Sequence, residues 1–91
     1  MKWNDLKKDI TSISDEEKRI LEVTALLASV RQEKNLTQQE LAKITKLTQA
    51  QIARAENSSY TPSLKTIAKI AEGLDLEIAF IDKNSNELVR H

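Results

Sequence analysis

Residues 36–57, LTQQELAKITKLTQAQIARAEN, contain two short segments that each resemble a capped helix. Thr37 is followed three residues later by Glu40, and this spacing predicts a capping box at the start of a helix. Thr48 is placed to cap a second helix, which we expect to end near Glu56. The predicted break, at residues 45–47, leaves room for only a short turn. Two short helices joined in this way indicate a helix-turn-helix unit.

The second of these segments, residues 46–57, contains little material for a core, only Leu47, Ile52 and small alanines. A helix this short is marginal in water without packing. We expect its outward positions to be Gln49, Ala50, Ala53 and Arg54. In the major groove of DNA, a glutamine amide matches adenine, an arginine fork matches guanine, and alanine leaves room for a thymine methyl group. The composition of this face therefore suits a helix that enters the major groove.

A long helix is expected before this unit, to about Lys34. Ser14 is its candidate N-cap, and Glu17 would complete a capping box. Asn35 suits a left-handed residue just beyond the helix. Its apolar residues repeat at helical spacing and indicate one buried face: Ile20, Val23, Leu27 and Val30.

The helix-turn-helix unit should be followed by one more helix. Ser63 is its candidate N-cap, and Gly73 is expected to end it. Its inner face is predicted to consist of Leu64, Ile67, Ala68 and Ala71. In the first motif helix the expected inner face is Leu41, Ala42 and Ile44.

The two ends of the chain have patterns of their own. At the N-terminus, apolar residues three and four positions apart predict a short helix: Trp3, Leu6, Ile10 and Ile13. Near the C-terminus, residues 76–82, LEIAFID, alternate as in a β-strand. Because a lone strand has unpaired edges, we expect it to pair with the same strand of a second copy, through Leu76, Ile78 and Phe80.

Composition excludes several classes of protein. The chain has 91 residues, one glycine, one proline and no cysteine, which suits one small helical domain and excludes a disulfide scaffold or a cysteine zinc site. Neither a membrane span nor a secretory leader is evident, so we expect a cytoplasmic protein. No catalytic triad-like set and no glycine-rich phosphate loop is present, so we expect neither an enzyme nor a cofactor or metal.

Charge is unevenly distributed along the chain, although the formal net charge is zero. Residues 37–71 hold five basic and two acidic side chains, whereas residues 72–91 hold two basic and five acidic ones. A basic middle and an acidic tail are compatible with DNA binding, but a random fluctuation gives the same pattern. Charge alone therefore does not decide the function.

The spacing of the motifs LTQxELA, IxRxEN and PSLxTIxKIAxGL resembles that of the phage-repressor-like (Cro-like, or XRE) helix-turn-helix family over residues 20–74. The resemblance implies an all-α, five-helix repressor-like fold, here with a short N-terminal helix and a C-terminal strand that pairs across a dimer. The expected division is an N-terminal extension at 1–14, a DNA-binding domain at 15–75, and a dimerisation strand and tail at 76–91.

The same resemblance implies roles for individual residues. Base contacts are expected at Gln49, Ala50 and Arg54. Contacts to the DNA backbone or groove edge are expected at Gln38, Lys46, Thr48, Gln51, Asn57, Ser58, Ser59 and Tyr60. Gln38 should also support the recognition helix, and a salt bridge between Arg31 and Glu56 should hold that helix in place. The family often has glycine at the positions of Lys46 and Ser58, and this chain departs from the family pattern at both.

Size, layout and the MKWNDLK start resemble the HigA-type antitoxins of toxin–antitoxin pairs more narrowly. This implies a cytoplasmic homodimer that represses its own operon by binding operator DNA and neutralises a small ribonuclease toxin. The toxin would contact the stripe Trp3, Leu6, Ile10 and Ile13, although the same stripe is equally suited to packing on the protein's own core. Two alternatives remain: a free-standing phage or plasmid repressor, and a coactivator-type adaptor that binds other proteins.

Overall fold

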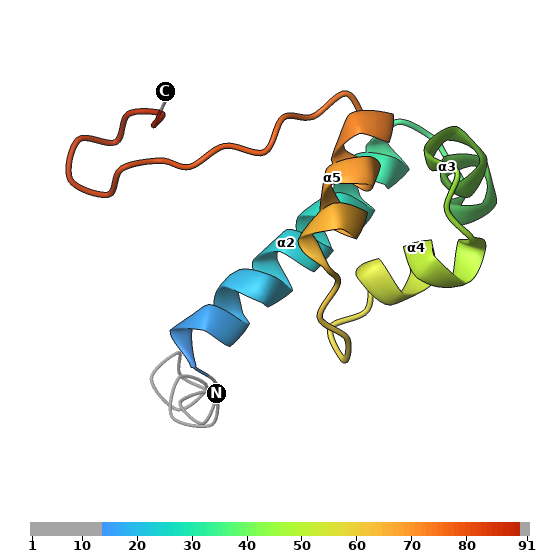
Figure 1. Cartoon of the computed structure of the whole chain (residues 1–91), viewed down its shortest axis with the longest axis horizontal. Helices are drawn as coiled ribbons and strands as arrows, with labels where there is room; N and C mark the ends of the chain where they lie inside the picture. Colours follow the sequence, from blue (N-terminus) through green and yellow to red (C-terminus); the bar gives the residue numbers. More distant parts are fainter. Residues whose placement is uncertain (1–13, 90–91) are drawn as a thin grey trace.

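The computed structural model describes residues 14–89, which form four α-helices and an irregular C-terminal segment (Figure 1). The helices are α2 (Asp15–Glu33), α3 (Gln38–Thr45), α4 (Gln49–Ala55) and α5 (Leu64–Gly73). Helices α3, α4 and α5 pack on one another, and the N-terminal half of α2 projects beyond them (Figure 1). No helix in the described residues is long and apolar enough to cross a membrane.

Hydroxyl side chains start all four helices, as the sequence predicts. Thr37 and Thr48 each form a complete capping box, with Glu40 and Gln51 respectively. The hydrogen bond from the Thr37 backbone N–H lowers the pKa of the Glu40 carboxyl. At Ser63 and Ser14 the side chain accepts the N–H three residues on, from Thr66 and Glu17 respectively, and no second half of a capping box is among the described contacts. These bonds satisfy backbone donors that a helix start leaves without partners.

One small core lies where the four helices meet. Its fully buried members are Leu41 of α3, Ile52 of α4, Ile70 of α5 and Leu74, which follows α5. Leu27 brings α2 into the same cluster. Burying each such side chain contributes about 1.5–3 kcal/mol relative to leaving it in water, so this cluster is the main apolar contribution to stability.

The predicted inner faces of α3 and α5 are wrong in part. Ile44 is 53% exposed and Leu64 is 70% exposed, whereas Ile70 is buried. The reason is a close approach between α5 and α3 at Gly73, where an added Cβ would lie 2.6 Å from Thr45 Cγ2. This contact turns α5 so that Ile70 and Leu74 face the core.

The reason for the glycine also differs from the predicted one. Gly73 does not have a positive φ; the left-handed residue after α5 is Asp75, with φ of 60°. Position 73 requires a residue without a Cβ because α3 lies against it. Asn35 does have the left-handed conformation predicted for the end of α2, with φ of 58°.

The predicted fold class needs two corrections. The described residues contain four helices instead of five, and the helix predicted for residues 3–13 lies outside them. The predicted strand at residues 76–82 is also wrong: between residues 14 and 89 the only β contact is an isolated antiparallel bridge between Ile81 and Leu88. An alternating sequence forms a strand only when a neighbouring backbone supplies hydrogen bonds along its length, and the body of the chain offers none there.

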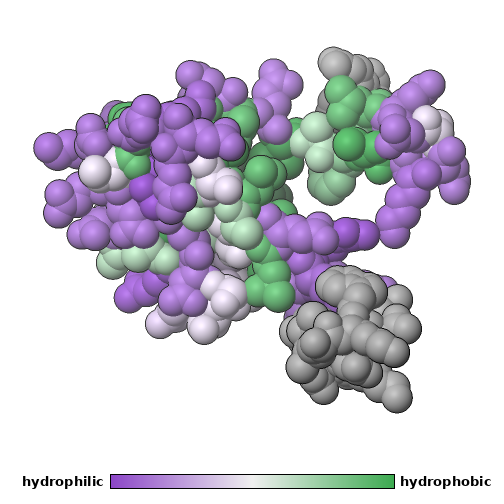
Figure 2. Space-filling view, turned by 180° about the vertical axis from the view of Figure 1, so that it is seen from behind, coloured by the Kyte–Doolittle hydropathy of each residue, from purple (hydrophilic) through white to green (hydrophobic). Residues whose placement is uncertain are grey.

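We call residues 77–89 the C-terminal arm. It leaves the helical body after Leu76, which packs on the core, and doubles back on itself (Figure 1). The Asp82 side chain accepts hydrogen bonds from the Asn84 and Ser85 N–H groups and so fixes the reversal. The large apolar side chains of the C-terminal arm are exposed: Ile78, Phe80, Ile81, Leu88 and Val89. Figure 2 shows apolar surface gathered on the arm, away from the helical body.

Candidate nucleic-acid interface

Helix α4 has two faces of different character. Ile52 and Ala55 are almost completely buried and anchor the helix on the core. Gln49, Ala50 and Arg54, the predicted base-contacting residues, are all exposed. The helix therefore presents hydrogen-bonding groups to the outside while its few apolar atoms are used for attachment.

The turn before α4 is tight and involves backbone strain. Lys46 adopts the left-handed conformation, with φ of 61° and ψ of 28°. This conformation is unfavourable for a residue with a Cβ, which is why glycine is common at such a position. The turn is nevertheless formed, because the N–H groups of Lys46 and Leu47 both donate to the Ala42 carbonyl. The left-handed turn that glycine usually supports is thus reached here with lysine, whose side chain is exposed.

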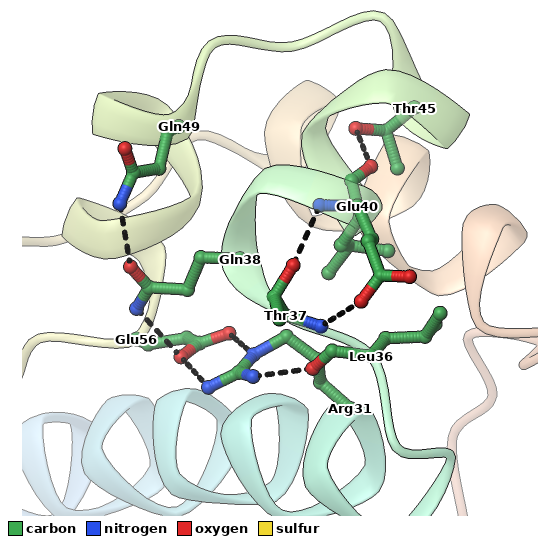
Figure 3. Close-up of polar contacts among 9 residues, drawn as sticks. Arg31, Leu36, Thr37, Gln38, Glu40, Thr45, Gln49 and Glu56 are labelled. Carbon is green, nitrogen blue, oxygen red and sulfur yellow. Dashed lines mark hydrogen bonds and ion pairs between the residues drawn. The ribbon is translucent and has the colours of Figure 1, made fainter.

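The ion pair expected between Arg31 and Glu56 is present and mostly buried (Figure 3). Arg31 Nε donates to Glu56 Oε2 at 2.7 Å and Nη2 donates to Oε1 at 3.0 Å, while the two side chains are only 11% and 7% exposed. Arg31 Nη1 also donates to the Leu36 carbonyl at 2.6 Å. The hydrogen bonds to Glu56 raise the pKa of Arg31, although burial opposes this. One arginine thus connects the end of α4 to α2 and to the segment before α3.

A chain of amide contacts extends this pair to the exposed face of α4 (Figure 3). Gln38 Nε2 donates to Glu56 Oε1 at 3.2 Å. The Gln38 oxygen then accepts from Gln49 Nε2 at 3.4 Å, close to the upper limit for a hydrogen bond. Because Glu56 can only accept, it orients the Gln38 amide with its oxygen toward Gln49. The side chain at the start of α4 is therefore positioned from the interior of the domain.

Besides Gln38 and Thr48, two further residues predicted to contact DNA have structural roles in the free protein. The Gln51 side-chain oxygen accepts from the Thr48 N–H at 2.8 Å and completes the cap of α4. The Asn57 side chain accepts from the Ser59 N–H at 2.8 Å and shapes the loop after α4. In that loop Ser58, Ser59 and Tyr60 are exposed. The loop lies directly after the recognition helix, on the same motif.

Sequence reasoning missed the link between Gln49 and Gln38 and the contact of Arg31 with Leu36. Two glutamines that open successive helices of the motif are a signal for the first contact, but their separation depends on the angle between α3 and α4. The second contact involves a backbone carbonyl, for which the sequence contains no signal. The predicted toxin-contacting stripe, Trp3 to Ile13, lies outside the described residues.

Comparison with known proteins gives a family and several relatives. The family model Helix-turn-helix, HTH_3, matches residues 27–81. The ImmF control region 10 kDa protein of Bacillus phage phi105 is 32% identical over 65 residues, which is 71% of this chain and 72% of that protein. The uncharacterized HTH-type transcriptional regulator y4dL of Sinorhizobium fredii (strain NBRC 101917 / NGR234) is 30% identical over 69 residues, or 76% of this chain. This chain spans only 35% of the length of y4dL.

Two solved structures are also similar. A chain of a HipA-HipB-O2-O3 complex matches with a TM-score of 0.65 and 33% identity, covering 70% of this chain and 90% of that one. A chain of a HipB(S29A)-O2 20mer complex matches with a TM-score of 0.66, also at 33% identity, covering 70% and 89%. The narrower resemblance to HigA-type antitoxins is not confirmed by these matches.

The chain belongs to the XRE-type helix-turn-helix family. Its described relatives include a transcriptional regulator and a phage control protein. In a helix-turn-helix fold the second helix of the motif is the recognition helix, and in this chain that helix is α4.

Proposed function

We propose that this protein is an antitoxin that binds operator DNA as a homodimer, represses its own operon and neutralises a toxin protein. The observation that carries the proposal is the orientation of α4. Its apolar residues Ile52 and Ala55 are buried, and its exposed face holds two residue types that read bases in the major groove, glutamine and arginine. A mostly buried ion pair fixes the end of the same helix.

Base recognition would be divided among three side chains. Gln49 is oriented through Gln38 and is suited to an adenine, which needs a donor and an acceptor together. Arg54 has an exposed guanidinium that can bind both acceptors of a guanine. Ala50 leaves space for a thymine methyl group.

Contacts to the DNA backbone would surround this face. Lys46, in the turn before α4, is exposed and supplies a positive charge. Ser58, Ser59 and Tyr60 are exposed in the loop after α4. Four other residues already have hydrogen-bond partners in the free protein, so they would support the interface more than contact the DNA directly: Gln38, Thr48, Gln51 and Asn57. Phosphate contacts of this kind position a protein on DNA without reading its sequence.

A homodimer is proposed because dimers of helix-turn-helix proteins read two half-sites about one turn of DNA apart. The C-terminal arm exposes Ile78 and Phe80, and Phe80 is 74% exposed. Apolar groups of this size favour burial against another surface. Leu76, the third expected dimer residue, is half-buried on the core of its own chain, so the proposed contact begins beyond it.

The antitoxin role rests on the similarity to HipB. HipB is found in one solved complex with a second protein, HipA, and with O2 and O3, and in another with an O2 20mer. By analogy, one small domain would bind both an operator and a toxin. The toxin class first expected from the sequence is a ribonuclease, and this remains part of the proposal.

A free-standing phage repressor is the second candidate function. It is favoured by the similarity to the phage phi105 control protein, of which this chain covers 72%. Co-expression with the adjacent gene separates the two: co-purification of a small toxic protein supports the antitoxin, and its failure with intact operator binding supports the phage-type repressor.

Operator recognition is tested by substituting Arg54 and measuring binding to the promoter region of its own gene. Arg54→Ala should cost about 1–3 kcal/mol of binding free energy and relax base preference at one position. Arg54→Lys is the matched control because it keeps the charge and loses the fork. If lysine restores both affinity and base preference, Arg54 contacts a phosphate and the proposed base contact is wrong.

A further inference from the structure

The first half of α2 carries an apolar surface that no described element covers. The core-facing stripe of α2 includes Thr24 and Leu27, and it continues toward the N-terminus through Val23 and Ile20. There α2 projects beyond the other helices (Figure 1), and Val23 is 37% exposed. The apolar stripe of α2 is therefore longer than the core that buries it.

A groove lies between this part of α2 and the segment that leads into α5. It has a volume of about 140 Å³, and its walls are mainly apolar: Arg19, Ile20, Val23, Thr61, Pro62 and Ile67. A cavity of about 150 Å³ can hold benzene, so this groove has room for one apolar side chain of similar size. A second hollow shares Ile20 and Thr61 and continues the groove along α2.

The segment before Ser14 is 13 residues long, which is enough to reach this groove. Ser14, the N-cap of α2, has an extended conformation, with φ of −68° and ψ of 162°, so α2 does not continue through it. Val23 lies about 14 Å along α2 from Ser14, at about 1.5 Å per residue. A helix over residues 3–13 would be about 16 Å long. A segment of this length that turns back at Ser14 spans the groove.

We propose that residues 3–13 fold back along α2 and lay the apolar stripe Trp3, Leu6 and Ile10 over the groove of their own chain, with one of these side chains inserted. The spacing of these residues gives the segment one apolar face, which is what a groove of this kind accepts. Being joined directly to α2, the segment is present at a high effective concentration that a separate partner lacks.

The proposal chooses between the two roles that the sequence leaves open for the stripe, and it does not depend on DNA binding. It also has a consequence for the interface. Thr61 and Pro62 follow the loop that carries Ser58, Ser59 and Tyr60, so the docked segment holds the end of this loop against α2.

Trp3 is the only tryptophan in the chain, so its fluorescence reports directly on docking. The native chain should emit at shorter wavelength than the denatured chain. Val23→Glu, which places a charge in the groove, should shift the emission toward the denatured value. Ala25→Glu is the matched control, because Ala25 is exposed on the same helix and does not line the groove. Circular dichroism should show that both variants keep their helices.

Equal emission from native and denatured chains would overturn the proposal, as would an equal shift in both variants. A second measurement identifies the occupant, since the chain has no native cysteine. Thr61→Cys is combined in turn with Leu6→Cys and Ile10→Cys, and each pair is oxidised in dilute solution. A disulfide within one chain supports the proposal. Disulfide-linked dimers mean that a second copy occupies the groove, and these, or the absence of any disulfide, contradict it.

Discussion

Helix α4 and the C-terminal arm are both short segments. Their compositions suggest that the arm is the more firmly packed of the two, whereas in the structure α4 is anchored and the arm is exposed. The arm has the more apolar sequence, with Ile78, Phe80 and Ile81 close together, yet its apolar side chains are exposed. In α4 only Ile52 and three alanines are apolar, yet the helix is firmly anchored. The difference shows that a segment is fixed by satisfied backbone groups and a few buried contacts more than by its content of apolar residues.

The largest expected effect is on the anchoring of α4. Arg31→Ala leaves the Glu56 carboxylate mostly buried without its partner, so it should lower the free energy of unfolding by about 3–5 kcal/mol. Replacing both residues by apolar ones of similar size, in Arg31→Met with Glu56→Leu, should cost less than the single change. Urea unfolding measures both. If the single variant is as stable as the native chain, the ion pair does not hold α4 in place.

The next largest effect comes from one substitution, isoleucine to alanine, made once in α4 and once in the C-terminal arm. Ile52→Ala removes a completely buried side chain and should lower the free energy of unfolding by about 2–5 kcal/mol. Ile78→Ala, in the arm, should change it by no more than about 0.5 kcal/mol in dilute solution. By light scattering at higher concentration, Ile78→Ala should reduce the fraction of dimer. Equal losses of stability would show that the arm packs on the body.

The smallest effect concerns the strained turn before α4. Lys46→Gly relieves the left-handed conformation and should stabilise the fold by about 0.5–1 kcal/mol relative to Lys46→Ala. Both variants lose the same charge, so their difference reports on the backbone alone. Both should reduce the salt dependence of operator binding by the amount expected for one phosphate contact. If the alanine variant is the more stable, Lys46 is not strained.

Much of the fold is local and was therefore predictable. The N-caps were predictable because each cap hydroxyl accepts a hydrogen bond from an N–H group only three residues away: Ser14, Thr37, Thr48 and Ser63. The helix-turn-helix motif follows from these caps and from the short turn between α3 and α4. The pairing of Arg31 with Glu56 was predictable only through resemblance to a family, since the two residues are 25 positions apart.

The remainder depended on tertiary packing. Close contact at Gly73 sets the rotation of α5, and this rotation decides that Ile70 is buried and Leu64 is exposed. The strand predicted at residues 76–82 failed because alternation describes side chains, whereas a strand also needs a second backbone. Sequence by itself thus determined where helices begin and which motif they form, because those interactions span three or four residues. Only the tertiary structure decided which faces are buried and how Gln49 is held, because those contacts join residues that are distant in the chain.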